Sequence, residues 1–310
     1  MAQPTAADIA KLCDDWCTAS ATPDGGMAIG ANTERFRLLA NGVVFHELDH
    51  EMLCTAIVST SKVLLRHGLN TIIDHDHVAL WSWCSELLLS PRAQIFPNEQ
   101  REIKSLYETA IHASLAGCRK PVGSKEEWQE QNRIEELQPH HSKLLIRKSG
   151  ILLTYLAFPL LEAVLKRACA RFVAFDGKVV AAFTIAHSHG ASRQYDPQGR
   201  CSSLRDMLLL HHDHVADADL KTLVDQFRDH ISALDRTQDP FDLIYSWRNQ
   251  SLHGTASFQT IGGTILNFAL LVSLSELKQN FDQHRATILD HCRREAQSPH
   301  KSPWSFYPPY

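Results

Sequence analysis

The sequence predicts a mainly α-helical protein with one small β-hairpin, and two observations support this fold class. Apolar residues recur at helical spacing through most of the 310 residues. Glycines and prolines fall mainly between these periodic segments, where they end helices. We therefore expect a helical bundle in the C-terminal half, with the hairpin inserted into it, and a helical N-terminal region before it.

The expected helices form two groups on either side of a polar stretch that is poor in aliphatic residues. The helices of the first group cover roughly 5–20, 33–66, 76–90 and 98–117. The helices of the second group cover roughly 143–170, 204–215, 217–234, 241–253 and 260–294. The chain then divides into a helical region of unknown role at 1–120, a polar connector at 121–142, a helical domain at 143–294 and a Pro-rich tail at 295–310.

Two local features should interrupt the second group of helices. Pro159 lies inside the helix at 143–170 and is expected to kink or divide it, because proline removes a backbone donor. Over 171–183, β-branched and aromatic residues flank Asp176-Gly177, which predicts the hairpin at this place. A loop is expected to follow at 187–203.

Composition restricts the class of protein. The chain is 44% hydrophobic with a formal net charge of -4, which argues against a protein that coats polyanions in bulk. Its eight cysteines are scattered without a CxxC pair, a pattern typical of reduced intracellular thiols. Cys13 and Cys17, one helical turn apart, are expected to pack in the core.

Nothing in the sequence favours a membrane or export. The N-terminus lacks a basic region followed by an apolar run, so no signal peptide is expected. The apolar stretches at 151–165 and 260–277 are interrupted by Glu162 and Asn267, and each is short for a bilayer span. We expect both to be buried helices, with no membrane partner and a cytoplasmic location.

The stretch HELDH, His46 to His50, fits the H-E-x-x-H pattern of zinc hydrolases, in which Glu47 would activate water. Its periodicity predicts a helix. Asp49 is charged where such helices are usually apolar, and a third ligand such as Glu86 is singled out by nothing else. With 18 histidines and 35 acidic residues, chance matches are expected. A solvated helix face is the favoured interpretation, and a zinc hydrolase is the weaker one.

Other histidines are ambiguous for the same reason. They lie in DHDH (Asp74 to His77), in HHDH (His211 to His214) and at His187 and His189. Polar residues between helices explain these groups more simply than metal ligands do.

The stretch WRNQSLHG, Trp247 to Gly254, carries more specific chemistry. Arg248 offers a planar, permanently charged set of donors suited to phosphate. Asn249 can both donate and accept hydrogen bonds, and His253 can exchange a proton near neutral pH. A phosphate clamp and a proton-transfer group are the minimum needed to cleave RNA through its own 2′-hydroxyl.

The same residues are also typical of a helix end, because a basic residue and a histidine before Gly254 suit a helix C-terminus. At about 100° per residue, Arg248 and His253 lie about 140° apart around the helix. One copy of the motif would therefore be half of a site, and a second copy across a dimer axis could complete it.

The spacing of Arg248, Asn249 and His253 resembles the R-x(4–6)-H motif of HEPN domains, in its RNxxxH form. The apolar segments at 149–167 and 260–277 would be its partners in a HEPN-like bundle over 143–294. The resemblance implies an endoribonuclease that needs no metal or cofactor, acts on RNA and forms a homodimer. In it, His253 transfers a proton, Arg248 stabilises the phosphate and Asn249 orients them. Such domains often belong to defence or toxin-like systems. The alternative is a non-catalytic HEPN module for dimerisation or sensing.

Overall fold

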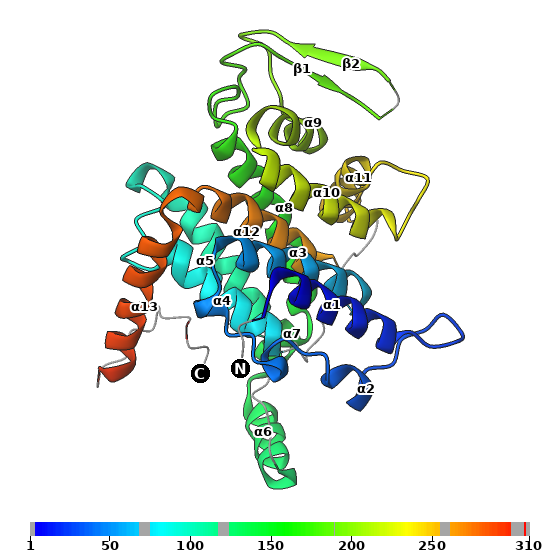
Figure 1. Cartoon of the computed structure of the whole chain (residues 1–310), viewed down its shortest axis with the longest axis vertical. Coiled ribbons are helices and arrows are strands. Elements are labelled where there is room, and N and C mark those ends of the chain that lie inside the picture. Colours follow the sequence, from blue (N-terminus) through cyan, green and yellow to red (C-terminus); the bar gives the residue numbers. More distant parts are fainter. Residues whose placement is uncertain are drawn as a thin grey trace.

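The computed structural model describes residues 4–67, 75–116, 124–188, 190–254, 261–298 and 307. This part of the chain is mainly α-helical with one two-stranded hairpin, which confirms the predicted fold class (Figure 1). The helices that precede the hairpin are α1 (Ala6–Ser20), α2 (Ala31–Glu34), α3 (His50–His67), α4 (His75–Leu89), α5 (Arg101–Leu115), α6 (Lys125–Leu137), α7 (His140–Arg147) and α8 (Ser149–Ala168). Those that follow it are α9 (Leu204–Leu210), α10 (Ala218–Ser232), α11 (Pro240–Leu252), α12 (Gly262–Ser275) and α13 (Phe281–Gln297).

Helix α12 lies at the centre of the molecule, between α8 and α3 (Figure 1). Gly262 lets it approach α8 closely, because a Cβ there would stand 2.7 Å from Thr154 Oγ1. The fully buried Asn267 accepts a hydrogen bond from Trp81 Nε1 at 2.7 Å and donates to the Ile57 carbonyl at 3.0 Å. Its polar groups are therefore satisfied, as a buried amide requires.

Both sequence halves contribute to one hydrophobic core. Helix α3 packs against α12, and α5 packs against α8. Helix α6 contains no buried side chain and projects from the rest of the molecule (Figure 1). The polar stretch at 121–142 therefore includes an exposed helix, and the proposed division into domains on either side of it stays a prediction.

The prediction of a single long helix at 33–66 is wrong for the first half of that range. After α2 the chain makes 3-10 turns at Leu39–Asn41 and Phe45–Glu47, and α3 begins only at His50. Asp49 accepts the backbone N–H of Met52 at 2.8 Å, which caps the start of α3. The helices expected at 143–170 and 260–294 are likewise two helices each. The first is divided at Lys148 and not at Pro159, through which α8 continues.

The hairpin lies further along the chain than predicted. Strands β1 (Phe183–Ala186) and β2 (Ser192–Tyr195) pair antiparallel. Strand β1 begins at the last residue of the segment predicted to be the hairpin, and β2 lies within the segment expected to be a loop. At Asp176-Gly177 there is a tight turn with an isolated bridge between Val173 and Val179. The turn signal was correct, but the longer ladder forms where Phe183 stacks on Tyr195, with ring centroids 4.8 Å apart.

Helix α8 is also the helix, among the residues described, that is long and apolar enough to cross a membrane. It buries ten residues inside the fold, as a core helix does. Length and composition do not distinguish these roles, so the expected absence of a membrane partner stays a prediction. All seven cysteines in the described residues are buried and free, and Cys13 and Cys17 pack in the core as expected.

Candidate functional site

Helix α11 presents the Arg-Asn-x-x-x-His motif. Asp239 caps it by accepting the backbone N–H of Phe241 at 2.9 Å, and Pro240 occupies its first turn. The buried side chains of Ile244 and Trp247 fix the helix against the core. Arg248 and Asn249 follow Trp247 on the partly exposed side of the helix.

Arg248 is held by two side chains. Its Nε donates to Glu162 Oε1 of α8 at 2.8 Å, and its Nη1 donates to Asn249 Oδ1 at 3.1 Å. The Arg248 side chain is 27% exposed and that of Glu162 is 22% exposed, so the ion pair is partly shielded from water. A guanidinium carries more N–H donors than these two contacts use, so Arg248 keeps donors for an anion.

His253 lies at the exposed end of α11. It is the C-cap residue, and its backbone N–H donates to the Asn249 carbonyl at 3.0 Å. Gly254 follows with a φ of 69°, the left-handed conformation that ends many helices. The helix end foreseen by the simpler interpretation is therefore real. Arg248, however, donates to Glu162 and Asn249 on the side of the helix, and its role is not that of a C-terminal cap.

The HELDH stretch does not form the helical pair that zinc hydrolases use. His46 and Glu47 belong to a 3-10 turn, Leu48 is extended, and α3 starts at His50. His46 Nδ1 is hydrogen-bonded to the Tyr307 hydroxyl, while His50 Nε2 donates to the Leu274 carbonyl at 3.0 Å. The expectation that this stretch is helical is corrected, because Asp49 caps α3 in the middle of the motif.

Glu86, the residue considered as a third zinc ligand, is also engaged elsewhere. It is buried and accepts the backbone N–H of Tyr307 at 3.0 Å. Over the part of the chain that the structure describes, no group of three His, Cys, Asp or Glu side chains has the arrangement of a metal site. The geometry therefore gives the zinc alternative no support.

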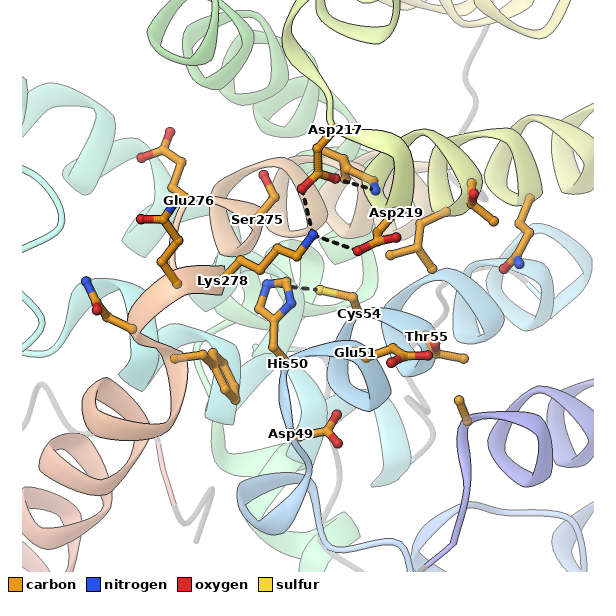
Figure 2. A pocket seen from close by; sticks show the side chains of 18 of the residues that line it. Asp49, His50, Glu51, Cys54, Thr55, Asp217, Asp219, Ser275, Glu276 and Lys278 are labelled. Atoms are coloured by element: carbon orange, nitrogen blue, oxygen red, sulfur yellow. Dashed lines mark hydrogen bonds and ion pairs between the residues drawn. The ribbon is translucent and has the colours of Figure 1, made fainter.

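His50 lines a cavity of about 1210 Å³ with several carboxylates (Figure 2). Lys278 Nζ lies between Asp217 Oδ2 at 2.6 Å and Asp219 Oδ2 at 2.8 Å. Burial lowers the pKa of His50, which favours its neutral form. The ammonium group of Lys278 is thus paired with the carboxylates of Asp217 and Asp219 in this cavity.

The other histidine groups have structural contacts. Asp76 accepts the backbone N–H groups of Leu38 and Leu39 at 2.6 and 3.0 Å. His212 lies 2.8 Å from Asp213 and 3.1 Å from Asp225, and His214 Nε2 donates to the Thr184 carbonyl at 2.7 Å. These contacts support the simpler interpretation of HHDH. Asp74 and His189 lie outside the described residues.

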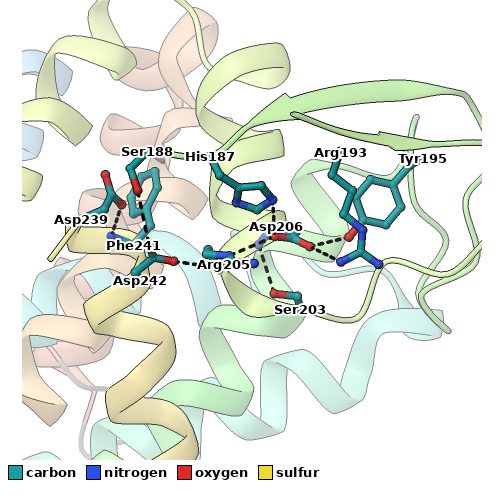
Figure 3. Close-up of polar contacts among 10 residues, drawn as sticks. All are labelled: His187, Ser188, Arg193, Tyr195, Ser203, Arg205, Asp206, Asp239, Phe241 and Asp242. Carbon is teal, nitrogen blue, oxygen red and sulfur yellow. Dashed lines mark hydrogen bonds and ion pairs between the residues drawn. The ribbon is translucent and has the colours of Figure 1, made fainter. Parts of the chain in front are cut away.

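A buried carboxylate that the sequence did not single out joins the hairpin to α9 (Figure 3). Asp206 is fully buried. Its Oδ2 lies 3.2 Å from Arg193 Nη1, and its Oδ1 lies 3.2 Å from Arg205 Nε. It also accepts a hydrogen bond from the Tyr195 hydroxyl. Arg205 continues the network to Asp242 of α11 at 3.0 Å, so the hairpin is fixed to the helix that carries the motif.

Glu162 is the site residue that sequence reasoning missed. The sequence marks it only as a charge inside an apolar stretch. That position was a usable signal, because a carboxylate in an apolar helix requires a polar partner.

Comparisons of the chain with protein-family models, with curated protein sequences and with solved structures give no match. The geometry of this site is therefore the basis on which a function is inferred.

Proposed function

We propose that the chain is a metal-independent endoribonuclease of the HEPN type, with Arg248, Asn249 and His253 as its working residues. The observation that supports this most is the state of Arg248, which is oriented by two side chains and still has donors for a phosphate. The exposed His253 near it supplies a group able to transfer protons.

The reaction that these groups fit is attack by a ribose 2′-oxygen on the adjacent phosphorus. The 2′-hydroxyl loses its proton, the new oxygen–phosphorus bond forms, and the bond from phosphorus to the 5′-oxygen breaks. The departing 5′-oxygen gains a proton, so the products are a 2′,3′-cyclic phosphate and a 5′-hydroxyl. His253 takes part in proton transfer, and Arg248 stabilises negative charge on the phosphate.

A second copy of the chain is part of the proposal. Arg248 and His253 are about 140° apart around α11, so one copy does not direct both groups at one phosphate from one helical face. Two motifs that meet across a two-fold axis would supply the missing group. Light scattering that finds only monomers at concentrations where RNA is cleaved would contradict this part of the proposal.

The test is cleavage of single-stranded RNA in excess chelator by wild type, His253→Ala and a matched control, His141→Ala. His141 is exposed on α7, so its loss should not affect a site on α11. We expect His253→Ala to lower the cleavage rate by about 10²-fold or more, the range for loss of a general acid or base. Equal rates in wild type and His253→Ala would remove the catalytic assignment.

The second candidate is a non-catalytic HEPN module that dimerises or senses a partner. The ion pair between Arg248 and Glu162 favours it to some extent, because part of the arginine charge is already balanced. This alternative predicts no cleavage of any RNA by wild type and a dimer that substitutions on α11 weaken.

A further inference from the structure

We infer that Glu162 is a positioning residue for Arg248 at the proposed RNA site, an inference that rests on the proposed function. Glu162 comes from α8, 86 positions away from Arg248 in the sequence, and its Oε1 accepts the Arg248 Nε–H at 2.8 Å. This hydrogen bond to Arg248 connects Glu162 to the motif on α11.

The two contacts of Arg248 lie at different parts of the guanidinium. Glu162 holds the Nε side, while Asn249 Oδ1 accepts from Nη1 at 3.1 Å. A planar group held at two separate nitrogens has a fixed orientation, and these two contacts do not use the Nη2 donors or the second Nη1 donor. Donors fixed before the substrate arrives stabilise developing charge without a reorganisation cost.

The position of Glu162 within α8 supports a dedicated role. It is the one acidic residue in this 20-residue helix, which buries ten of its residues in the core. A partly buried carboxylate loses hydration and is retained where a cation compensates it. Arg248 is that cation, so the two residues are matched across the contact between α8 and α11.

The chain offers a control for the stability of such a pair. Arg167 of α8 donates to Glu276 Oε2 at 2.8 Å, with side-chain exposures of 17% and 32%. That pair also joins α8 to another segment at partial burial, but it does not involve the motif. Glu162→Ala and Glu276→Ala therefore remove comparable ion pairs at two different places.

The experiment measures kcat, KM and melting temperature for RNA cleavage in chelator by both variants. We expect Glu276→Ala to lower the melting temperature at least as much as Glu162→Ala, because Arg167 donates to Glu276 through three hydrogen bonds. A fall in kcat is expected for Glu162→Ala alone. The fall should be about 10- to 100-fold, because misplacing a catalytic group by about 1 Å can cost that much. Glu162→Gln keeps an oxygen that accepts from Nε and should restore most of kcat. An unchanged kcat in Glu162→Ala overturns the inference, as does an equal fall in Glu276→Ala.

A double variant separates positioning from an independent effect on catalysis. In an Arg248→Ala background, Glu162→Ala should change kcat no further, because Glu162 acts through the arginine. Multiplicative effects would overturn the inference while leaving the proposed function intact. The proposed function fails differently, when Arg248→Ala and His253→Ala both cleave RNA at the wild-type rate, and the inference then fails with it.

Discussion

HELDH at 46–50 and RNQSLH at 248–253 both place a histidine near a second reactive residue, but the fold uses them in different ways. His46 and His50 are partly buried and hydrogen-bonded to Tyr307 and to the Leu274 carbonyl. His253 is exposed at the end of α11, five positions after an arginine whose two hydrogen bonds leave N–H donors unused.

The difference indicates that residue spacing is a weaker guide to function than the exposure of the side chains and the hydrogen-bonding groups that the fold leaves unused. The first stretch matches a well-known motif, yet the start of α3 divides it and its histidines serve packing. The second is also a helix end, yet His253 is exposed and Arg248 and Asn249 are partly exposed. A histidine used for packing should affect stability when removed, whereas one used for catalysis should affect rate.

The largest expected effect is a contrast between two variants: His253→Ala should affect the cleavage rate, and His50→Ala should affect stability. His253→Ala should lower RNA cleavage by about 10²- to 10⁴-fold with little change in the free energy of unfolding. His50→Ala should leave cleavage by the folded protein unchanged and destabilise it by about 1–3 kcal/mol, because the Leu274 carbonyl loses one of its two hydrogen bonds and Phe281 loses a ring contact. Cleavage rates and denaturant unfolding of both variants check this. A large loss of cleavage in folded His50→Ala would break the comparison.

The next effect concerns stability against pH. Burial, with a smaller contribution from His212, lowers the pKa of His211 from 6.5 to about 4. Between these values the unfolded chain binds a proton at this residue that the folded protein does not. The contribution of His211 to stability should therefore fall as the pH drops from about 6.5 to 4, by up to about 3 kcal/mol, and stay constant below that.

His211→Leu should flatten that slope, and His141→Leu, at an exposed position, should not. Thermal unfolding at a series of pH values measures the slope of stability against pH for wild type and both variants. A slope that His211→Leu leaves unchanged would show that another group causes the pH dependence.

The smallest effect is expected for Tyr307→Phe, which removes the hydroxyl bonded to His46 and keeps the ring against Trp83. The loss of one partly buried hydrogen bond should lower the free energy of unfolding by about 1 kcal/mol. RNA cleavage should not change, because HELDH is assigned to packing. A tenfold loss of cleavage would mean that this stretch has a role in function.

Most helices were predictable from periodicity, because helices such as α1, α10 and α11 each bury one face. The errors arose where a side chain overrides the pattern. The cap at Asp49 begins α3 late, and a sequence pattern does not show which aspartate will accept a backbone N–H. The predicted position of the hairpin was wrong because the strands pair where Phe183 stacks on Tyr195. Local turn signals do not show this contact between residues that are distant in the sequence.

The candidate site was predictable in part. The order of Arg248, Asn249 and His253 on one helix follows from the sequence alone. Glu162 and the Asp206 network were not predicted as partners, because both depend on how α8, α9 and the hairpin pack against α11. Pairings over such sequence separations arise from the fold and leave only a weak local signal, here a lone charge in an apolar helix.

The most direct test of the central claim is the chemistry of the RNA ends that wild type produces in excess chelator. Attack by the 2′-oxygen predicts fragments that end in a 2′,3′-cyclic phosphate, with a 5′-hydroxyl on the following fragment, and their loss in His253→Ala. Fragments that carry a 3′-hydroxyl and a 5′-phosphate, or cyclic-phosphate products formed equally well by His253→Ala, would contradict the account.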